Sequence, residues 1–293
     1  LWFVGRMDPD GHGYVVPLVL RLTGRPDVRA LDAALVDVVT RHEVLRTVYP
    51  VANGVPYQHV LDPPETVLTT GPSDDAPPAF DVTTDRPLRA HLTTADDASV
   101  LTVHVHHIAA DGGSLAPLTR DLTTAYAARR AGHAPSWSPL PFQYVDHAVR
   151  ERAADSSAAV LDHWRARLAG LDVDRALPTD HPRTDVVMHP ASRITRTLSA
   201  ADTTALRRTA DRRRVTVFMA VWASVSTVLA QWTGRDDVAV GTAVARRDDP
   251  MYDDLIGLLV ETLVLRVRLD RQGTVDDLLD TVRADLTRDY EQA

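Results

Sequence analysis

The chain has 293 residues, of which 44% are hydrophobic and 25% are charged, and it carries a formal net charge of -8 at pH 7. This length is enough for one large or two smaller domains, and the acidic balance gives no general attraction for nucleic acid or for an anionic membrane. The sequence contains no cysteine, and all 32 of its basic residues are arginine, which excludes disulfides, thiolate metal sites, enzyme-borne thioesters, Schiff bases and the lysine of a P-loop.

Hydrophobic patterning in the first half predicts alternating strands and helices. Asp27 is the expected cap of a helix over residues 27–40, and Ser114 the expected cap of a helix whose inner face carries leucines and Tyr126. The other predicted elements are strands at 14–22, 54–61, 87–92 and 99–107, a helix end turning into a strand at 41–49, and a loop at 63–80.

The second half follows a Pro- and Gly-rich stretch, 132–141, which we interpret as a connector between two lobes. The predicted elements after it are helices at 144–152, 158–168, 200–213, 215–232 and 275–290, strands at 192–198, 237–245 and 256–268, and a loop at 177–183. The uncharged stretch 215–232 contains Ser, Thr and Gln, so a buried core helix is favoured over a membrane span. Alternation in both halves predicts an α/β or α+β protein with lobes at 1–152 and 153–293.

Titratable groups gather at one place, residues 103–114, at the end of the predicted strand 99–107. Two adjacent histidines and Asp111 lie there, followed by a glycine pair. Loops at strand ends commonly present catalytic groups, so a functional site is favoured here over an ordinary turn. Strand alternation puts His106 and His107 on opposite faces, and we expect His107 to be the more desolvated and neutral one. Asp111 is too far along the chain to be assumed bonded to His107, and pairing with an arginine is equally compatible with the sequence.

Five segments, in chain order, resemble the motifs of one family. They are residues 1–3 (the tail of a first motif), 41–47 (RHExLRT), 106–112 (HHxxxDG), 144–149 (YxDFAVW) and 256–262 (IGxFVNT). The sequence therefore resembles a condensation domain of nonribosomal peptide synthetases, in the superfamily of chloramphenicol acetyltransferase-like acyltransferases.

The resemblance implies an α/β (α+β) fold in which two chloramphenicol-acetyltransferase-like lobes form a V-shaped pseudodimer. Relative to that family the chain starts inside the first motif, at Leu1 without a methionine, and stops near the start of a late motif. We therefore expect a fragment whose second lobe is incomplete.

The implied reaction is amide formation. The α-amine of an acceptor aminoacyl thioester attacks a donor peptidyl or aminoacyl thioester, and both are carried on the 4'-phosphopantetheine arms of carrier proteins. The implied partners are the upstream donor and downstream acceptor carrier domains and the adjacent synthetase domains, in the cytoplasm, with no cofactor or metal of the domain's own.

The resemblance makes His107 the catalytic residue. A free α-amine has a pKa near about 8, so removing its proton before attack gains little. We expect His107 to take the proton as the ammonium acidifies during attack, or to orient the amine and stabilise the tetrahedral intermediate. The resemblance also pairs Asp111 with Arg46, gives His106 and Gly112 the role of shaping the loop, and makes Arg41 a weaker supporting residue.

Possible substrate-channel residues are Gly113, Ser114, Tyr144, Glu261 and Thr262. Gly113 stands where the family often has Trp, and Glu261 where it has Asn, which leaves substrate preference and activity open. Residues 14–22 and the helix after Gly113 resemble the subtype that accepts a D-configured donor.

Four alternatives remain open at this point. The chain could be an epimerisation domain, a coenzyme A-dependent acyltransferase, or a degenerate platform that only docks carriers or tailoring enzymes. A zinc or iron site built from His104, His106, His107 and Asp111 is disfavoured, because the spacing does not match HxHxDH and the two adjacent histidines point to opposite faces.

Overall fold

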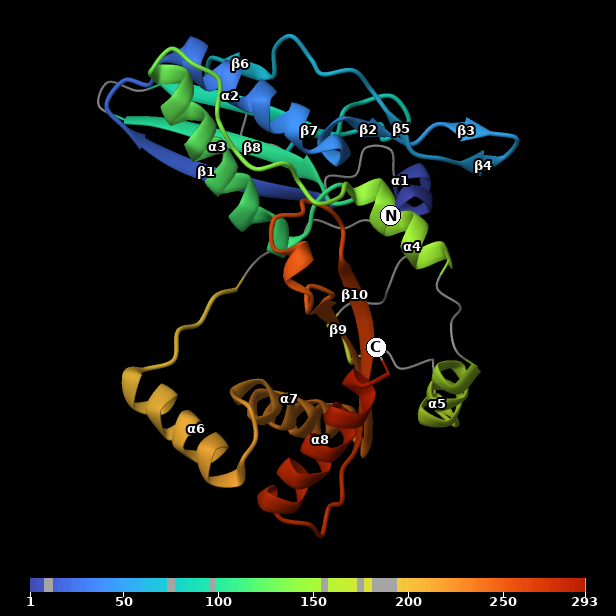
Figure 1. Ribbon diagram of the computed structural model, residues 1–293. Helices are drawn as coiled ribbons and strands as arrows, with labels where there is room; N and C mark the ends of the chain where they lie inside the picture. Colours follow the sequence, from blue (N-terminus) through green and yellow to red (C-terminus); the bar gives the residue numbers. More distant parts are fainter. Residues whose placement is uncertain are drawn as a thin grey trace. The chain divides into compact units, whose positions relative to one another are not determined.

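The computed structural model describes residues 1–7, 13–72, 77–94, 98–153, 158–172, 177–180 and 194–292. The chain packs as two compact units (Figure 1). The first is Leu1–Ala154 together with Ala245–Val260, and the second is Asp155–Val244 together with Glu261–Ala293. The expected lobes, 1–152 and 153–293, stay a prediction; the packing adds that the stretch 245–260 belongs with the first unit.

The first unit is built on a four-stranded sheet in the order β1-β8-β7-β6. Its strands are β1 (Val15–Thr23), β8 (Ala98–His106), β7 (Leu88–Thr94) and β6 (Leu68–Thr70). β8 pairs antiparallel with both β1 and β7, in registers that put Val15 opposite His106 and Leu88 opposite Val105. β6 pairs parallel with β7. The central strand β8 thus carries the histidines to one end of the sheet.

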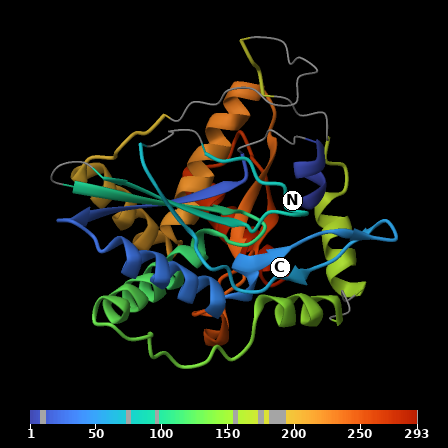
Figure 2. The same cartoon turned by 90° about the horizontal axis from the view of Figure 1, so that it is seen from above.

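Helices α2 (Val28–Arg41) and α3 (Leu115–Arg130) run side by side along one face of this sheet (Figures 1 and 2). Along β8, the residues Leu101, Val103 and Val105 are fully buried and belong to the same core as the apolar stripes of both helices. Their alternate neighbours, Thr102 and His104, are only partly buried. The period of two therefore sets which face of β8 packs against the helices.

Short elements complete the first unit. They are α1 (Trp2–Met7), the 3₁₀ turns η1 (Glu43–Arg46), η2 (Gly112–Ser114) and η3 (Pro250–Tyr252), α4 (Tyr144–Ala153), and the strand pairs β2 (Thr47–Val48) with β5 (His59–Val60) and β3 (Val51–Ala52) with β4 (Val55–Pro56). The segment 132–141, interpreted from the sequence as a connector between lobes, instead joins α3 to α4 inside this unit.

The second unit contains the strand pair β9 (Asp237–Ala245) and β10 (Val260–Arg268). The last residue of β9 and the first residue of β10 are counted with the first unit. Its helices are α5 (Ala158–Leu168), α6 (Ala200–Arg213), α7 (Val217–Thr233) and α8 (Val275–Tyr290). Its core is separate from the first and contains Leu265, Val267, Val282 and Leu286.

A buried arginine reinforces the second unit. Arg266 donates from Nε and Nη2 to both carboxylate oxygens of Asp237 at 2.9 and 2.7 Å, and from Nη1 to the carbonyls of Arg167 and Ala169. The guanidinium thus ties the C-terminal end of α5 to both strands, and its polar groups are paired inside the core as buried polar groups must be.

Most of the predicted elements are confirmed, including the capping of α2 by Asp27, whose carboxylate accepts from the Ala30 N–H. Three predictions are wrong. The loop predicted at 63–80 contains β6, the strand predicted at 54–61 is split into β4 and β5, and the described part of the predicted strand 192–198 is irregular and exposed. Residues 181–183 and 192–193 of two predicted segments lie outside the described residues.

The uncharged helix α7 is also less buried than predicted. One side of it packs in the core through Ala220, Trp222, Ala223 and Ala230, while Val228 and Trp232 on the other side are 56% and 63% exposed. Within the described residues, no single helix is long and apolar enough to cross a bilayer; α6 and α7 pass such a test only as a pair, bent by 103°.

Candidate active site

The histidine loop begins where β8 ends. His106 is the last residue of the strand, and the chain turns immediately, since the Ala109 N–H donates to the His106 carbonyl at 2.9 Å. The His107 N–H donates to the Tyr14 carbonyl at 2.7 Å. His107 therefore lies in the turn and not in the strand, so strand alternation does not fix the direction of its side chain.

His106, not His107, is the more desolvated histidine, which corrects the sequence-based prediction. Its side chain packs edge-on against the Phe80 ring, and its Nδ1 accepts from the Ile108 N–H at 3.1 Å. Burial, followed by the neighbouring His107, lowers the pKa of His106 to about 4. His106 is thus a neutral, buried residue that shapes the turn.

His107 is partly buried, and its Nδ1 is shielded from solvent. Among the described residues, no side chain or backbone group forms a hydrogen bond with its Nδ1. Asp111 makes its hydrogen bonds elsewhere, so the two residues do not form a His–Asp pair. The orientation of His107 is therefore set by the backbone of the turn.

Asp111 connects this turn to the segment 245–260, which is distant in sequence. Its Oδ1 lies 2.9 Å from Nη2 of Arg247, and its Oδ2 accepts from the Leu259 N–H at 2.9 Å. Burial opposes ionisation of Asp111, but the Leu259 N–H, Arg247 and Ser114 outweigh it and lower the pKa of the carboxyl. Asp111 is 2% exposed, so this charge is held inside the protein by its partners.

Ser114 is fully buried and belongs to the same hydrogen-bond network as Asp111. Its Oγ donates to the Gly257 carbonyl or Asp111 Oδ1, at 3.0 and 2.9 Å, and lies within 3.2 Å of the Gly257 and Asp111 N–H groups and of Arg247 Nη2. Ser114 is the N-cap residue of α3, as predicted, but its hydroxyl does not cap that helix; it forms a capping box with Asp111, the N-cap of the preceding turn η2. Ser114 is a buried polar residue of this network, and its role in a substrate channel stays a prediction.

The expected pairing of Asp111 with Arg46 is wrong. Arg46 instead contacts Glu43 at 3.2 Å and donates to the Leu61 carbonyl. η1 follows α2 directly, which keeps the Arg46 side chain beside its own turn. The arginine that pairs with Asp111 is Arg247, 136 residues further along the chain.

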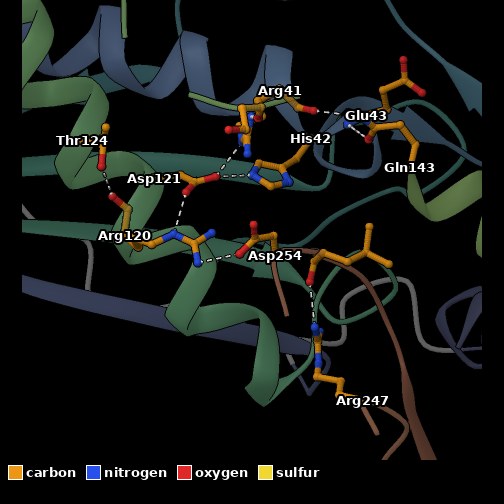
Figure 3. A network of polar contacts seen from close by, with 11 residues as sticks. Arg41, His42, Glu43, Arg120, Asp121, Thr124, Gln143, Arg247 and Asp254 are labelled. Atoms are coloured by element: carbon orange, nitrogen blue, oxygen red, sulfur yellow. Dashed lines mark hydrogen bonds and ion pairs between the residues drawn. The ribbon is translucent and has the colours of Figure 1, made fainter. Parts of the chain in front are cut away.

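Arg41 and His42 form a second network around Asp121 of α3 (Figure 3). Asp121 Oδ2 accepts from Arg41 Nε at 2.8 Å and from His42 Nε2 at 2.9 Å, while Oδ1 accepts from Arg120 at 3.0 Å. Arg120 also contacts Asp254 at 2.7 Å. This network ties α2 to α3 and to segment 245–260.

Ionisation in this network is opposite for its two buried members. Burial lowers the pKa of His42, because its hydrogen bond to Asp121 only partly offsets desolvation. Burial opposes ionisation of Asp121 too, but His42 and Arg120 outweigh it and lower its pKa to about 2. At neutral pH a neutral His42 therefore donates to an ionised Asp121, and Arg41 supports the fold of this region.

Tyr144 and its neighbour Gln143 bridge segments distant in sequence. The Tyr144 hydroxyl donates to the Leu258 carbonyl at 3.0 Å, and its ring covers the Cα of Gly257, where a Cβ would lie 2.8 Å from Cε2. Gln143 accepts from the Glu43 N–H and donates to the Arg41 carbonyl, at 3.1 and 3.0 Å. Burial raises the pKa of Tyr144 to about 12, so it stays a neutral hydrogen-bond donor.

The remaining predicted channel residues lie in different units. Gly113 is exposed in η2, whereas Glu261 and Thr262 are exposed at the start of β10 in the second unit. Their role in a channel stays a prediction. Across the described residues, no group of three or more His, Asp and Glu side chains is placed to hold a metal ion.

Sequence reasoning missed Arg247, Asp121 and Gln143. Arg247 follows Arg246 in an ordinary charged run, and Asp121 lies between Arg120 and Leu122 with no motif around it. Each acts on a partner about 80 or more residues away, so no local pattern marks it.

The comparison with protein families is decisive for this chain, because residues 1–293 match the model of the condensation domain. The chain belongs to the condensation-domain family of nonribosomal peptide synthetases. It is 42% identical, over 97% of its length, to a probable non-canonical synthetase, CymA, of Salinispora arenicola, and 41% identical, over 99%, to the isonitrile lipopeptide synthase of Mycobacterium tuberculosis. It spans only 4% and 12% of these two relatives.

A solved structure agrees with the fold. The X-domain from teicoplanin biosynthesis superposes with a TM-score of 0.91 at 30% identity, covering 99% of this chain and 68% of that one. The same domain is also known in complex with OxyB, where the TM-score is 0.89. The expected mixed helix and sheet fold of a condensation domain is confirmed.

Proposed function

We propose that this condensation domain forms an amide bond between a donor peptidyl or aminoacyl thioester and the α-amine of an acceptor aminoacyl thioester. Both substrates are delivered on the phosphopantetheine arms of carrier-protein domains of the same synthetase, in the cytoplasm. The domain supplies no cofactor of its own. A D-configured donor is the preferred substrate in this proposal.

One observation carries the proposal: in the turn after β8, His107 is partly exposed while its neighbours are buried and paired. His106 is buried against Phe80, and Asp111 is committed to Arg247 and Leu259. His107 is thus the titratable group of the turn that remains able to meet a substrate.

In the reaction, the amine nitrogen attacks the thioester carbonyl, forming the C–N bond, and collapse of the tetrahedral intermediate breaks the C–S bond. The nitrogen loses one proton and the leaving thiolate gains one. His107 is suited to take this proton as the ammonium acidifies and to return it to sulfur, or to hold the amine in line with the carbonyl. Either role contributes only while the ring is correctly placed.

The test is a His107→Ala variant of the domain within its natural synthetase module, supplied with donor- and acceptor-loaded carriers and followed by mass spectrometry. General acid–base catalysis contributes about 10²–10⁴-fold, so amide formation should fall by that order, to a degree that depends on the basicity of the acceptor amine. Varying the configuration of the donor in the same assay tests the D-donor preference.

His104→Ala is the matched control, because His104 lies on the same strand end with its side chain on the face away from the helices. It should retain activity. Full activity of His107→Ala with every acceptor, at an unchanged melting temperature, would refute the catalytic role.

A second candidate function is a docking platform for a tailoring enzyme, favoured by one observation. The relative most similar in fold among those described above, the teicoplanin X-domain, is found in complex with OxyB. A wild-type module that forms no amide with any loaded carrier, yet retains one tailoring enzyme on a pull-down from a mixture of purified candidates, would favour docking over catalysis.

A further inference from the structure

The second unit contains a surface cavity of about 400 Å³ between α5, β10 and α8. All of its lining residues belong to this one unit. The lining is mainly basic and consists of His163, Ala166, Arg167, Arg266, Arg268, Thr281, Asp285 and Arg288. A volume of this size is typical of a small-molecule site, and a lining of this charge favours an anionic ligand.

Two of these arginines are committed to the fold. Arg266 is 2% exposed and donates to both carboxylate oxygens of Asp237. Arg167 Nε donates to both carboxylate oxygens of Asp289 at 2.9 and 3.0 Å, and its Nη2 lies 3.2 Å from Asp285. Each of these guanidinium groups therefore has a carboxylate of its own inside the unit.

The other two arginines, Arg268 of β10 and Arg288 of α8, are not committed in this way. Their side chains are 69% and 58% exposed, and neither guanidinium forms a hydrogen bond with a described residue. The carboxylates in contact with them are Asp237, at 3.8 Å from Arg268, and Asp285, at 3.6 Å from Arg288. Because a guanidinium has five N–H donors and stays charged, both arginines bring spare donors and positive charge to the same cavity.

The charges around the cavity leave an excess of positive charge. The four guanidinium groups face three carboxylates, those of Asp237, Asp285 and Asp289, of which His163 also contacts the last at 3.3 Å. A helix dipole alone explains an arginine in the last turn of α8, but it does not explain Arg268, which lies on a strand. The convergence of the two exposed arginines from different elements therefore points to a shared ligand.

We propose that this cavity binds a phosphate group, which Arg268 and Arg288 hold between them beside the buried Arg167. The planar guanidinium matches the oxygen geometry of phosphate, and charge-assisted hydrogen bonds of this kind are about twice as strong as neutral ones. The bound group ties β10 to α8 where α5 packs against them. This proposal does not depend on His107 or on the amide-forming reaction.

The test is hydrogen exchange by mass spectrometry on the domain within its natural synthetase module, with and without inorganic phosphate. Sodium chloride keeps the ionic strength constant. Peptides over α5, β10 and α8 report on this site separately from any phosphate site elsewhere in the module. A site with a Kd of about 1 mM, in about 10 mM phosphate, slows exchange of these peptides about tenfold, because binding stabilises the closed state by a factor of 1 + [L]/Kd.

We expect this slowing in the wild type and none in the double variant Arg268→Gln/Arg288→Gln. The matched control is Arg165→Gln, since Arg165 is an arginine of α5 that is 73% exposed, pairs with Asp162 and does not line the cavity. The control should keep the full effect of phosphate.

Unchanged exchange on adding phosphate to the wild type would overturn the proposal, and so would slowing that persists in the double variant. Loss of the effect in Arg165→Gln would also overturn it, because the response would then reflect the general charge of the surface. Arg288→Glu provides an independent variant: it places a carboxylate at the cavity and should abolish the slowing by itself, and retained slowing would contradict the proposal.

A further arm, with glycerol 3-phosphate at the same concentration, separates two sources of the phosphate group. Stronger protection by the ester assigns the site to a small organic phosphate whose carbon part fills the rest of the cavity, and stronger protection by inorganic phosphate assigns it to the free ion. Equal protection means that the phosphate group alone is recognised. The readout needs no activity, so a module that forms no amide defeats the proposed function and leaves this result standing.

Discussion

At the scale of single residues, buried charges decide how this protein responds to acid. His42 and Asp121 are 1% and 4% exposed and hydrogen-bonded to each other. The lowered pKa of His42 means that the unfolded chain takes up its proton first, from about pH 6.5 downward. The depressed pKa of the Asp121 carboxyl also makes the protein less stable in acid. The stability that this carboxylate contributes is complete above about pH 4 and is lost as the pH falls toward 2.

The first unit should therefore lose stability progressively on acidification, beginning below about pH 6.5 and steepening below about pH 4. The shift of the Asp121 pKa from 3.8 to about 2 corresponds to roughly 2 kcal/mol. Urea unfolding or hydrogen exchange of α2 and α3 at pH 7, 5, 4 and 3 measures this change.

Asp121→Asn should be less stable at pH 7, because it leaves Arg41 buried without its carboxylate, and should lose less further stability between pH 4 and 3. Asp162→Asn is the control, since Asp162 forms an exposed pair with Arg165. An Asp121→Asn variant with the same slope against pH below 4 as the wild type would contradict the assignment.

At the scale of elements, the start of α2 depends on one side chain. The Asp27 carboxylate accepts from the Ala30 N–H at 3.0 Å, which satisfies one of the N–H groups left free at a helix start. Asp27→Ala should lower the free energy of unfolding by about 1 kcal/mol, and Asp27→Asn by much less, because the amide oxygen can still cap. Chemical denaturation of both variants checks the difference; equal losses would mean that the charge matters and the cap does not.

The capping of α2 shows what local sequence predicts well. A capping carboxylate followed by an apolar stripe fixes a helix within a few residues, and the alternation along β8 fixes which face is buried. The turn that carries His107 was also predictable, because the glycine pair 112–113 must end a strand. Local patterns of this kind account for most helices and strands of both units.

The partners of the site were not predictable in the same way. Asp111 was expected to pair with Arg46, and it pairs with Arg247 instead. Both arginines are compatible with the sequence, and only the packing of segment 245–260 onto the first unit decides between them. Likewise His106 takes the buried position because β8 stops one residue before the pattern would place His107 in the strand.

At the scale of the whole molecule, the described residues form two hydrophobic cores with no member in common. The first contains Leu101, which is fully buried against α2 and α3, and the second contains Leu265, which is 1% exposed. Removing a fully buried leucine side chain costs about 2–5 kcal/mol through lost burial and the cavity left behind. Each substitution to alanine should therefore destabilise the unit to which it belongs.

The two effects should also be independent. Substitutions at distant sites without shared partners add to within about 0.5 kcal/mol. Leu101→Ala should raise hydrogen exchange in β7, β8 and α3, and Leu265→Ala in β9, β10 and α8, while the double variant reproduces each change. If Leu101→Ala opened α8 as strongly as α3, the units would unfold as one cooperative body, and the separation of the cores would have no energetic meaning.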